Sequence, residues 1–188
     1  MLLQILTYTH HLTTMLFGIF LSAFFLGVKQ NKKNVCILLG GGAVSGLFFL
    51  ICNTVFGSLF TEAVYPIFVH LPLFLLLVFY YRFRWLPSII SIMTAYLCCQ
   101  FSNWAGIFAL SLSGLDWVYY LVRIIVTVAV FAFLSRYLCQ TTALLLAKSD
   151  RELYILGAMP FVYYVFDYST TKFSMLLYSG NKVVVEFL

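Results

Sequence analysis

Long apolar stretches separated by short polar segments dominate the pattern along this chain. Six stretches are long enough to be membrane-crossing helices, because a crossing takes about 20 apolar residues. They lie at residues 5–28, 35–56, 63–81, 86–110, 117–138 and 153–171. Each is apolar all round, as expected of helices in contact with lipid. The pattern predicts an all-α, polytopic transmembrane bundle that forms a single domain over residues 1–188.

Both ends of the chain bear on this prediction. Lys29, Lys32 and Lys33 follow the first apolar stretch instead of preceding it, so we interpret that stretch as a retained span and not as a cleaved signal peptide. Residues 183–188 begin another apolar run. We interpret this run as the start of a seventh span, and we expect the sequence to be a fragment or truncated product.

The composition supports a membrane protein. Hydrophobic residues make up 63% of the chain, charged residues make up 9%, and the mean hydropathy is +1.02. Soluble domains have about 45–50% apolar and about 25% charged residues. The net charge of +5 comes from basic residues beside the apolar stretches. We therefore expect the lipid bilayer as a partner, and no nucleic acid.

The charges alternate from one connection to the next, which predicts an orientation. Basic residues are enriched in cytoplasmic connections. Here they occupy alternate connections: Lys29, Lys32, Lys33, Arg82, Arg84, Arg136, Lys148 and Arg151. The segment 140–152, with its leucines and basic residues, is expected in the cytoplasmic interface. The N-terminus and residues 57–62, 113–116 and 178–182 are predicted to be external.

A few polar side chains lie within the predicted spans, all within about 12 Å of the external ends. They are Asn53, His70, Gln100, Asn103, Arg123 and Asp167. Ionisable residues in spans usually face the bundle interior or a wet cavity. The pattern favours a polar ligand pocket open to the outside. The alternative is that these groups only form hydrogen bonds between helices.

Two of these residues have opposite charge. Arg123 and Asp167 reach similar depth on consecutive spans, so we predict that they form an ion pair or share a hydrogen-bond network, with Gln100 as a third member. In the alternative, Arg123 extends to the surface and Asp167 is protonated or bound to tyrosine hydroxyls.

Glycine and proline suggest local features of the bundle. Gly42 and Gly46 form a G-x-x-x-G pattern, which predicts close helix packing and not phosphate binding. Pro72 and Pro160 are predicted to kink their helices, whereas Pro87 lies in a first turn, where proline costs little.

No catalytic motif appears in the sequence. The five cysteines show no metal-ligand spacing and are interpreted as packing residues. His10, His11 and His70 are too scattered to predict a metal site. We expect neither a metal nor another cofactor in this chain.

Several segments of the chain form a recognisable set: HLPL (70–73), FYYR (79–82), TAYLCCQ (94–100) before Trp104, YYVFDY (163–168), LLYSGN (176–181) and VEF (185–187). They resemble the membrane sensor halves of GHKL-type sensor histidine kinases of anaerobic Firmicutes, which are broadly similar to the accessory-gene-regulator peptide receptors. The resemblance covers roughly residues 65–188.

The resemblance implies a sensor domain in a bacterial plasma membrane that detects an external ligand. It also implies a homodimer, a seventh span, a phospho-accepting histidine and an ATP- and Mg-binding kinase domain beyond Leu188. The kinase parts do not occur in this sequence, so no ATP-site residues can be assigned. A substrate-binding membrane component of a small-molecule importer is the alternative function. An intramembrane enzyme is disfavoured, because Asp167 is the only acid deep in a predicted span.

Overall fold

The computed structural model describes residues 1–57 and 64–172, which form helices joined by short connections. Within these residues no strand is found. The longer helices are α1 (Leu2–Phe25), α2 (Lys32–Phe56), α6 (Trp85–Ser113), α7 (Asp116–Tyr137) and α9 (Asp150–Lys172). The shorter elements are α4 (Tyr65–Phe68), α5 (His70–Leu75), the π-helical turn η1 (Leu76–Tyr80) and α8 (Cys139–Leu146). The all-α prediction is confirmed.

Three helices, α2, α6 and α7, are long and apolar enough to cross a membrane. The other predicted spans are less apolar or shorter. The first half of α1 carries threonines and two histidines, and α9 begins with charged residues and contains Asp167. The apolar segment Pro66–Tyr80 is short. The predicted start of a seventh span, the segment 178–182 and residues 58–62, the last two of which are predicted to be external, lie outside the described residues.

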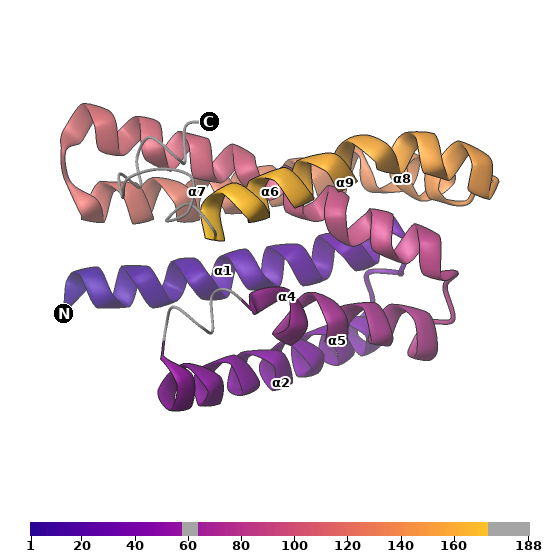
Figure 1. Ribbon diagram of the computed structural model, residues 1–188, viewed down its shortest axis with the longest axis horizontal. Helices are drawn as coiled ribbons and strands as arrows, with labels where there is room; N and C mark the ends of the chain where they lie inside the picture. Colours follow the sequence, from indigo (N-terminus) through magenta and orange to yellow (C-terminus); the bar gives the residue numbers. More distant parts are fainter. Residues whose placement is uncertain (58–63, 173–188) are drawn as a thin grey trace.

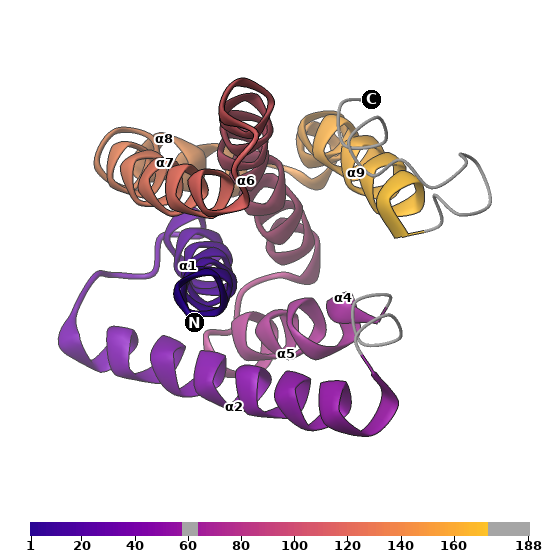
Figure 2. The same ribbon diagram turned by 90° about the vertical axis from the view of Figure 1, so that its left-hand side faces the viewer.

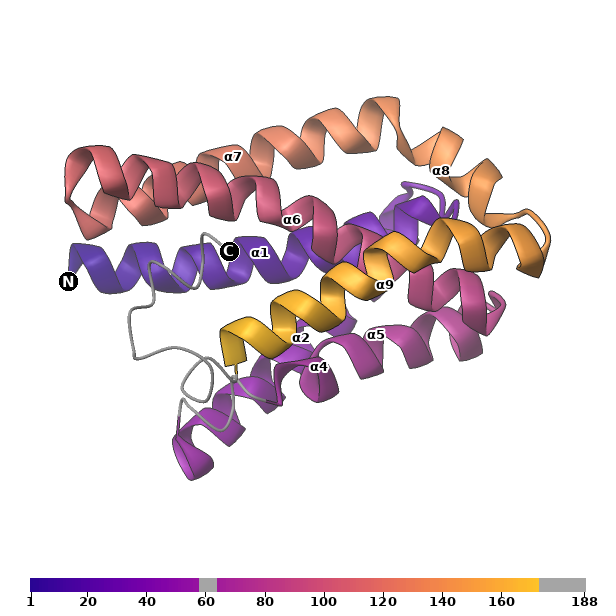
Figure 3. The same cartoon turned by 45° about the horizontal axis from the view of Figure 1, so that its top comes forward.

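The helices form a layered bundle (Figure 1). Viewed along its length, α1 packs beneath α6 and α7, while α6 separates α7 from α9 (Figure 2). On the other side of α1, α2 and α5 form a second layer. When the bundle is tilted, α9 runs obliquely across it from α8 (Figure 3). Helix α6 therefore contacts α1, α7 and α9.

Helix boundaries follow local chemistry. The side chain of Asn31 accepts a hydrogen bond from the Asn34 N–H at 2.8 Å and caps α2. Gly114 ends α6 in the left-handed region, with φ 67°, and its N–H donates to the Leu110 carbonyl at 2.8 Å. Ser149 precedes α9 and forms a capping box with Glu152, whose carboxylate accepts from the Ser149 N–H at 3.3 Å and from its hydroxyl at 2.9 Å.

The predicted span at 63–81 is not one continuous helix. A turn at Val69 separates α4 from α5. Pro72 has no N–H to donate to the Phe68 carbonyl, so the hydrogen-bond ladder is interrupted at this point. The helix is interrupted at Val69, three residues before Pro72, so the prediction of one unbroken span is wrong. Pro87 lies in the first turn of α6 and Pro160 lies inside α9, as predicted.

Connections rich in basic residues gather at one end of the bundle, which we call the basic end and define by residues 26–31, 81–84 and 147–149. There Arg84 forms an ion pair with Asp150 at 2.8 Å and donates to the Lys148 carbonyl at 2.7 Å. Asn34 donates to the Lys29 carbonyl at 2.8 Å and accepts from the Tyr81 hydroxyl at 3.5 Å. The predicted grouping of these connections on one side is confirmed.

The best-packed core lies toward the basic end. The buried residues of the second half of α1 pack there against buried residues of α6 and α9, including Phe25, Leu21, Ile90 and Leu153. The buried Ser91 hydroxyl of α6 donates to the Ser22 carbonyl of α1 at 2.6 Å. The first residues of α1, at the opposite end, are largely exposed. The bundle is therefore held together most tightly at its basic end.

Candidate functional site

A network of polar and aromatic side chains joins α5, α6 and α9, and we call it the α5–α6–α9 network. Its members are His70, Tyr96, Gln100, Asn103, Tyr164 and Asp167. Gln100, Asn103 and Asp167 lie in the halves of α6 and α9 farther from the basic end. Four of the six predicted polar residues therefore meet in one place.

Asp167 on α9 is the acceptor at the centre of this network. The Tyr96 hydroxyl donates to its Oδ2 at 2.5 Å, and Gln100 Nε2 donates to the same oxygen at 3.3 Å. Asn103 Nδ2 in turn donates to Gln100 Oε1 at 3.3 Å. Helix geometry explains this arrangement, because residues spaced by three or four, such as Tyr96, Gln100 and Asn103, share one face of α6.

His70 extends the network to α5. A hydrogen bond joins its Nδ1 to the Tyr164 hydroxyl of α9 at 2.9 Å. The Tyr164 ring packs edge-on against the Tyr96 ring with centroids 4.9 Å apart, and the His70 ring lies 6.0 Å from Tyr96. Aromatic contacts thus connect the hydrogen-bonded pair of His70 and Tyr164 to the hydrogen-bonded pair of Tyr96 and Asp167.

A cavity of about 180 Å³ adjoins the network at His70 and Tyr164. Apart from these two residues, its walls are Leu71 and Phe74 of α5 and Ile89, Ile92 and Met93 of α6. The expectation of a polar pocket therefore needs correction. The polar groups bond to one another, and the space beside them is mostly apolar, so it suits a small apolar ligand with one hydrogen-bonding group.

The other two predicted residues lie elsewhere. Asn53 is in the last turn of α2, where its carbonyl accepts from the Gly57 N–H at 3.1 Å. Within the described residues, no hydrogen bond joins its side chain to the α5–α6–α9 network.

The predicted ion pair between Arg123 and Asp167 is wrong for the described part of the chain. Arg123 of α7 donates to the Tyr119 hydroxyl of its own helix and lies over the Tyr119 ring, with Cζ 5.0 Å from the centroid. Since α6 lies between α7 and α9, the two charged residues face different neighbours (Figure 2). The alternative is confirmed in one respect, because Asp167 binds a tyrosine hydroxyl. Gln100 does bond to Asp167, as predicted, but Arg123 does not take part in this contact.

Tyr96 and Tyr164 were not predicted as site residues. The spacing of Tyr96 to Gln100, and of Tyr164 to Asp167, places each tyrosine one helical turn from a predicted polar residue. That spacing was the available signal. Near membrane surfaces tyrosines are common for other reasons, so spacing alone did not distinguish these two.

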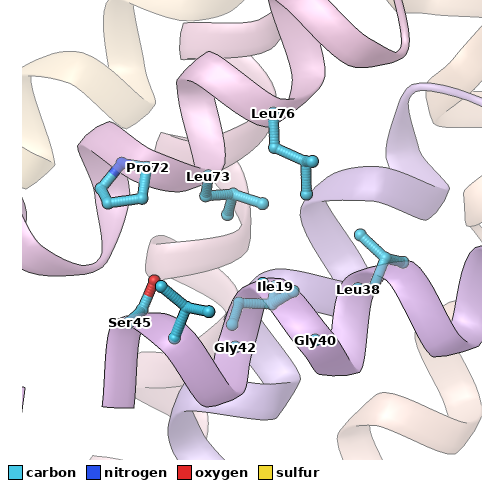
Figure 4. Close-up of a pocket in the computed structure, with 10 residues that line it drawn as sticks. Ile19, Leu38, Gly40, Gly42, Ser45, Pro72, Leu73 and Leu76 are labelled. Carbon is cyan, nitrogen blue, oxygen red and sulfur yellow. The ribbon is translucent and has the colours of Figure 1, made fainter. Parts of the chain in front are cut away.

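The glycine run of α2 lines a second cavity, of about 220 Å³, between α1, α2 and the α5–η1 segment (Figure 4). Its walls include Ile19, Leu38, Pro72 and Leu76 and are almost entirely apolar. A Cβ atom at Gly42 would lie 3.1 Å from Ile19 Cδ1 of α1. Gly42 therefore packs closely against α1, as predicted, whereas a Cβ atom at Gly46 would be in ordinary contact with Met15 Cε at 3.5 Å, and Gly40 has no neighbour within 4 Å.

Among the residues that the structure describes, no group of three histidine, cysteine or acidic side chains is arranged to hold a metal ion. Comparison with protein families, curated proteins and solved structures finds no match for this chain. The geometry of the α5–α6–α9 network and its cavity therefore carries the functional argument.

Proposed function

We propose that this chain is the membrane-embedded input domain of a sensor histidine kinase, and that it detects an external ligand at the α5–α6–α9 network. One observation carries the proposal. Three separate segments that resemble such sensors, at 70–73, 94–100 and 163–168, contribute His70, Tyr96, Gln100, Tyr164 and Asp167 to a single connected network. The resemblance and the site thus involve the same residues.

The cavity gives the network a way to respond to a ligand. A molecule bound beside His70 and Tyr164 would contact α5, α6 and α9 together. It would compete for, or strengthen, the hydrogen bond between His70 and Tyr164. Because a ligand shifts a conformational equilibrium by its difference in affinity for two states, such contacts would alter the position of α9 against α6.

Toward the basic end, α9 is fitted closely to α6. A Cβ atom at Gly157 would lie 2.7 Å from Ile90 Cδ1. A displacement of α9 at the network would therefore pivot about this contact. It would reach both the α8–α9 connection, which Arg84 holds, and the chain that follows residue 172.

We propose the six-span arrangement with the basic end in the cytoplasm. In this arrangement α1, α9 and residues 65–80 cross the membrane together with α2, α6 and α7. Their polar groups are covered by neighbours, as with the buried His10 of α1 and the hydrogen-bonded Asp167 of α9. Polar groups within membranes require such partners.

The coding DNA beyond codon 188 and its neighbouring genes provide the test. A kinase ATP-binding module, in frame or in an adjacent gene whose product co-purifies with this chain, is the expected result. Co-purification with an ATP-driven transport subunit would instead support the importer function. A stop codon after codon 188, with neither partner encoded nearby nor co-purifying, would contradict the sensor proposal.

A further inference from the structure

Two buried polar atoms on α7 have no hydrogen-bond partner in the described structure: Arg123 Nε and Thr127 Oγ1. Thr127 is only 2% exposed. The two residues are spaced i, i+4 and therefore lie on the same face of α7, one turn apart. Buried donors without partners are rare, and each calls for a specific explanation such as a bound ion or water.

The surroundings of Arg123 contain no negative charge within the described residues. Its guanidinium bonds to the neutral Tyr119 hydroxyl, and its stem packs against Gly106 of α6. His10 of α1 and Cys99 of α6 lie within electrostatic range. Asp167 is on the far side of α6 and is bonded to Tyr96 and Gln100.

A guanidinium does not lose its proton in proteins, so Arg123 must carry its charge inside the bundle. An arginine at the middle of a span is disfavoured, and intramembrane charges normally pair with an opposite charge or with backbone carbonyls. Tyr119 satisfies one nitrogen but supplies no countercharge. Nε is left as a second, buried donor, and Thr127 lies one helical turn away on the same face of α7.

We propose that Arg123 and Thr127 form a binding site for a small monovalent anion at the α1–α6–α7 interface. The anion accepts hydrogen bonds from Arg123 Nε and from the Thr127 hydroxyl, and it neutralises the guanidinium. A free halide and the carboxylate of a small organic acid both have this chemistry. The site is separate from the α5–α6–α9 network and does not depend on the proposed sensor function.

The test measures the thermal unfolding midpoint of the purified full chain in detergent. Chloride or acetate replaces gluconate stepwise at constant ionic strength. A ligand that binds only the folded state raises the midpoint with its concentration. We expect a saturable rise with at least one of the two anions, and the anion that acts identifies the source as a halide or a carboxylate.

Variants locate the effect. Arg123→Gln is expected to abolish the rise, and Thr127→Val, which keeps the shape but removes the hydroxyl, to increase the half-saturating concentration about tenfold by deleting one charged hydrogen bond. Arg136→Gln, at the other end of α7, is the matched control and keeps the wild-type response. If Arg123→Gln does not fold, Arg123→Lys tests whether the Nε donor is required.

An absent response in the wild type, or an identical response in both Arg123→Gln and Thr127→Val, would overturn the proposal. The acidic residues outside the described part of the chain provide a further check. A response that arises only in Glu62→Gln or Glu186→Gln would assign the countercharge to that carboxylate and would also overturn the anion site.

Discussion

The Tyr96 hydroxyl of α6 donates a 2.5 Å hydrogen bond to the Asp167 carboxylate of α9. The two residues are 71 positions apart in the sequence, so the contact links helices that are not consecutive. It also gives an acidic group within the bundle a donor from a neighbouring helix. The position of α9 therefore depends on a polar contact at the network and on apolar packing near the basic end.

The contact between Tyr96 and Asp167 predicts energetic coupling. Tyr96→Phe and Asp167→Asn should each destabilise the protein, and the double variant should lose less than the sum by about 1 kcal/mol, in the range measured for hydrogen bonds between membrane helices. Denaturant unfolding in detergent measures the cycle. Tyr154→Phe, at a 60% exposed position of α9, is the control and should have little effect. Strictly additive losses would contradict the link.

Gly106 allows the stem of Arg123 to lie against α6. A Cβ atom there would be 2.4 Å from Arg123 Cγ and 2.9 Å from Cδ, so Gly106→Ala should cost about 1–3 kcal/mol of stability through overpacking. At Gly18 of α1, a Cβ atom would have no neighbour within 4 Å. Gly18→Ala should therefore be neutral or slightly stabilising. Similar thermal midpoints for the two variants would show that Arg123 does not occupy this position.

The close approach of α9 to α6 at Gly157 predicts a compensating pair. Gly157→Ala brings a methyl group 2.7 Å from Ile90 Cδ1 and Cγ1, which forces the helices apart. Ile90→Ala removes these atoms and leaves a cavity. Combined, the two changes should be less harmful than the sum of the single variants, as measured by unfolding in detergent. A double variant with fully additive losses would argue against this packing.

The capping box at the start of α9 predicts a dependence on pH. Hydrogen bonds from the Ser149 hydroxyl and from Lys148 lower the pKa of Glu152 below its ordinary value of 4.5. A carboxylate with a lowered pKa stabilises the fold above its unfolded pKa, and this contribution is lost as the pH falls through the folded pKa.

Glu152→Ala should therefore lower the thermal midpoint at neutral pH, and its difference from wild type should shrink as the pH falls below 4.5. Arg151→Ala, at the neighbouring exposed position, should show no such convergence. A difference between Glu152→Ala and wild type that is constant across this range would exclude the ionised capping role.

Hydropathy predicted most helices well, because apolar length is a property of the sequence alone. The predicted spans at 86–110 and 117–138 correspond to α6 at Trp85–Ser113 and α7 at Asp116–Tyr137. The sixth predicted span begins at residue 153, three residues after the start of α9 at Asp150, because the first turn of α9 is polar and hydropathy does not detect it. The break at Val69 was not predicted. It follows from the missing N–H of Pro72, which leaves a carbonyl in the preceding turn without its helical hydrogen bond.

Depth in a span predicted which polar residues lie at similar levels, but it does not specify which helix each one faces. His70, Gln100, Asn103 and Asp167 do meet. Arg123 does not join them, because consecutive helices were assumed to be neighbours and α6 instead lies between α7 and α9. Contacts between distant helices depend on the packing of the whole bundle, and depth alone does not determine it.

We propose that the chain crosses the bilayer with its basic end inside and the α5–α6–α9 network toward the outside. Labelling of single cysteines by a membrane-impermeant thiol reagent tests it, in intact cells and in a background without the five natural cysteines. A cysteine at Gly114 should react from outside, whereas one at Lys32 should react only after the membrane is permeabilised. Strong external labelling at position 32, with protection at position 114, would contradict the account.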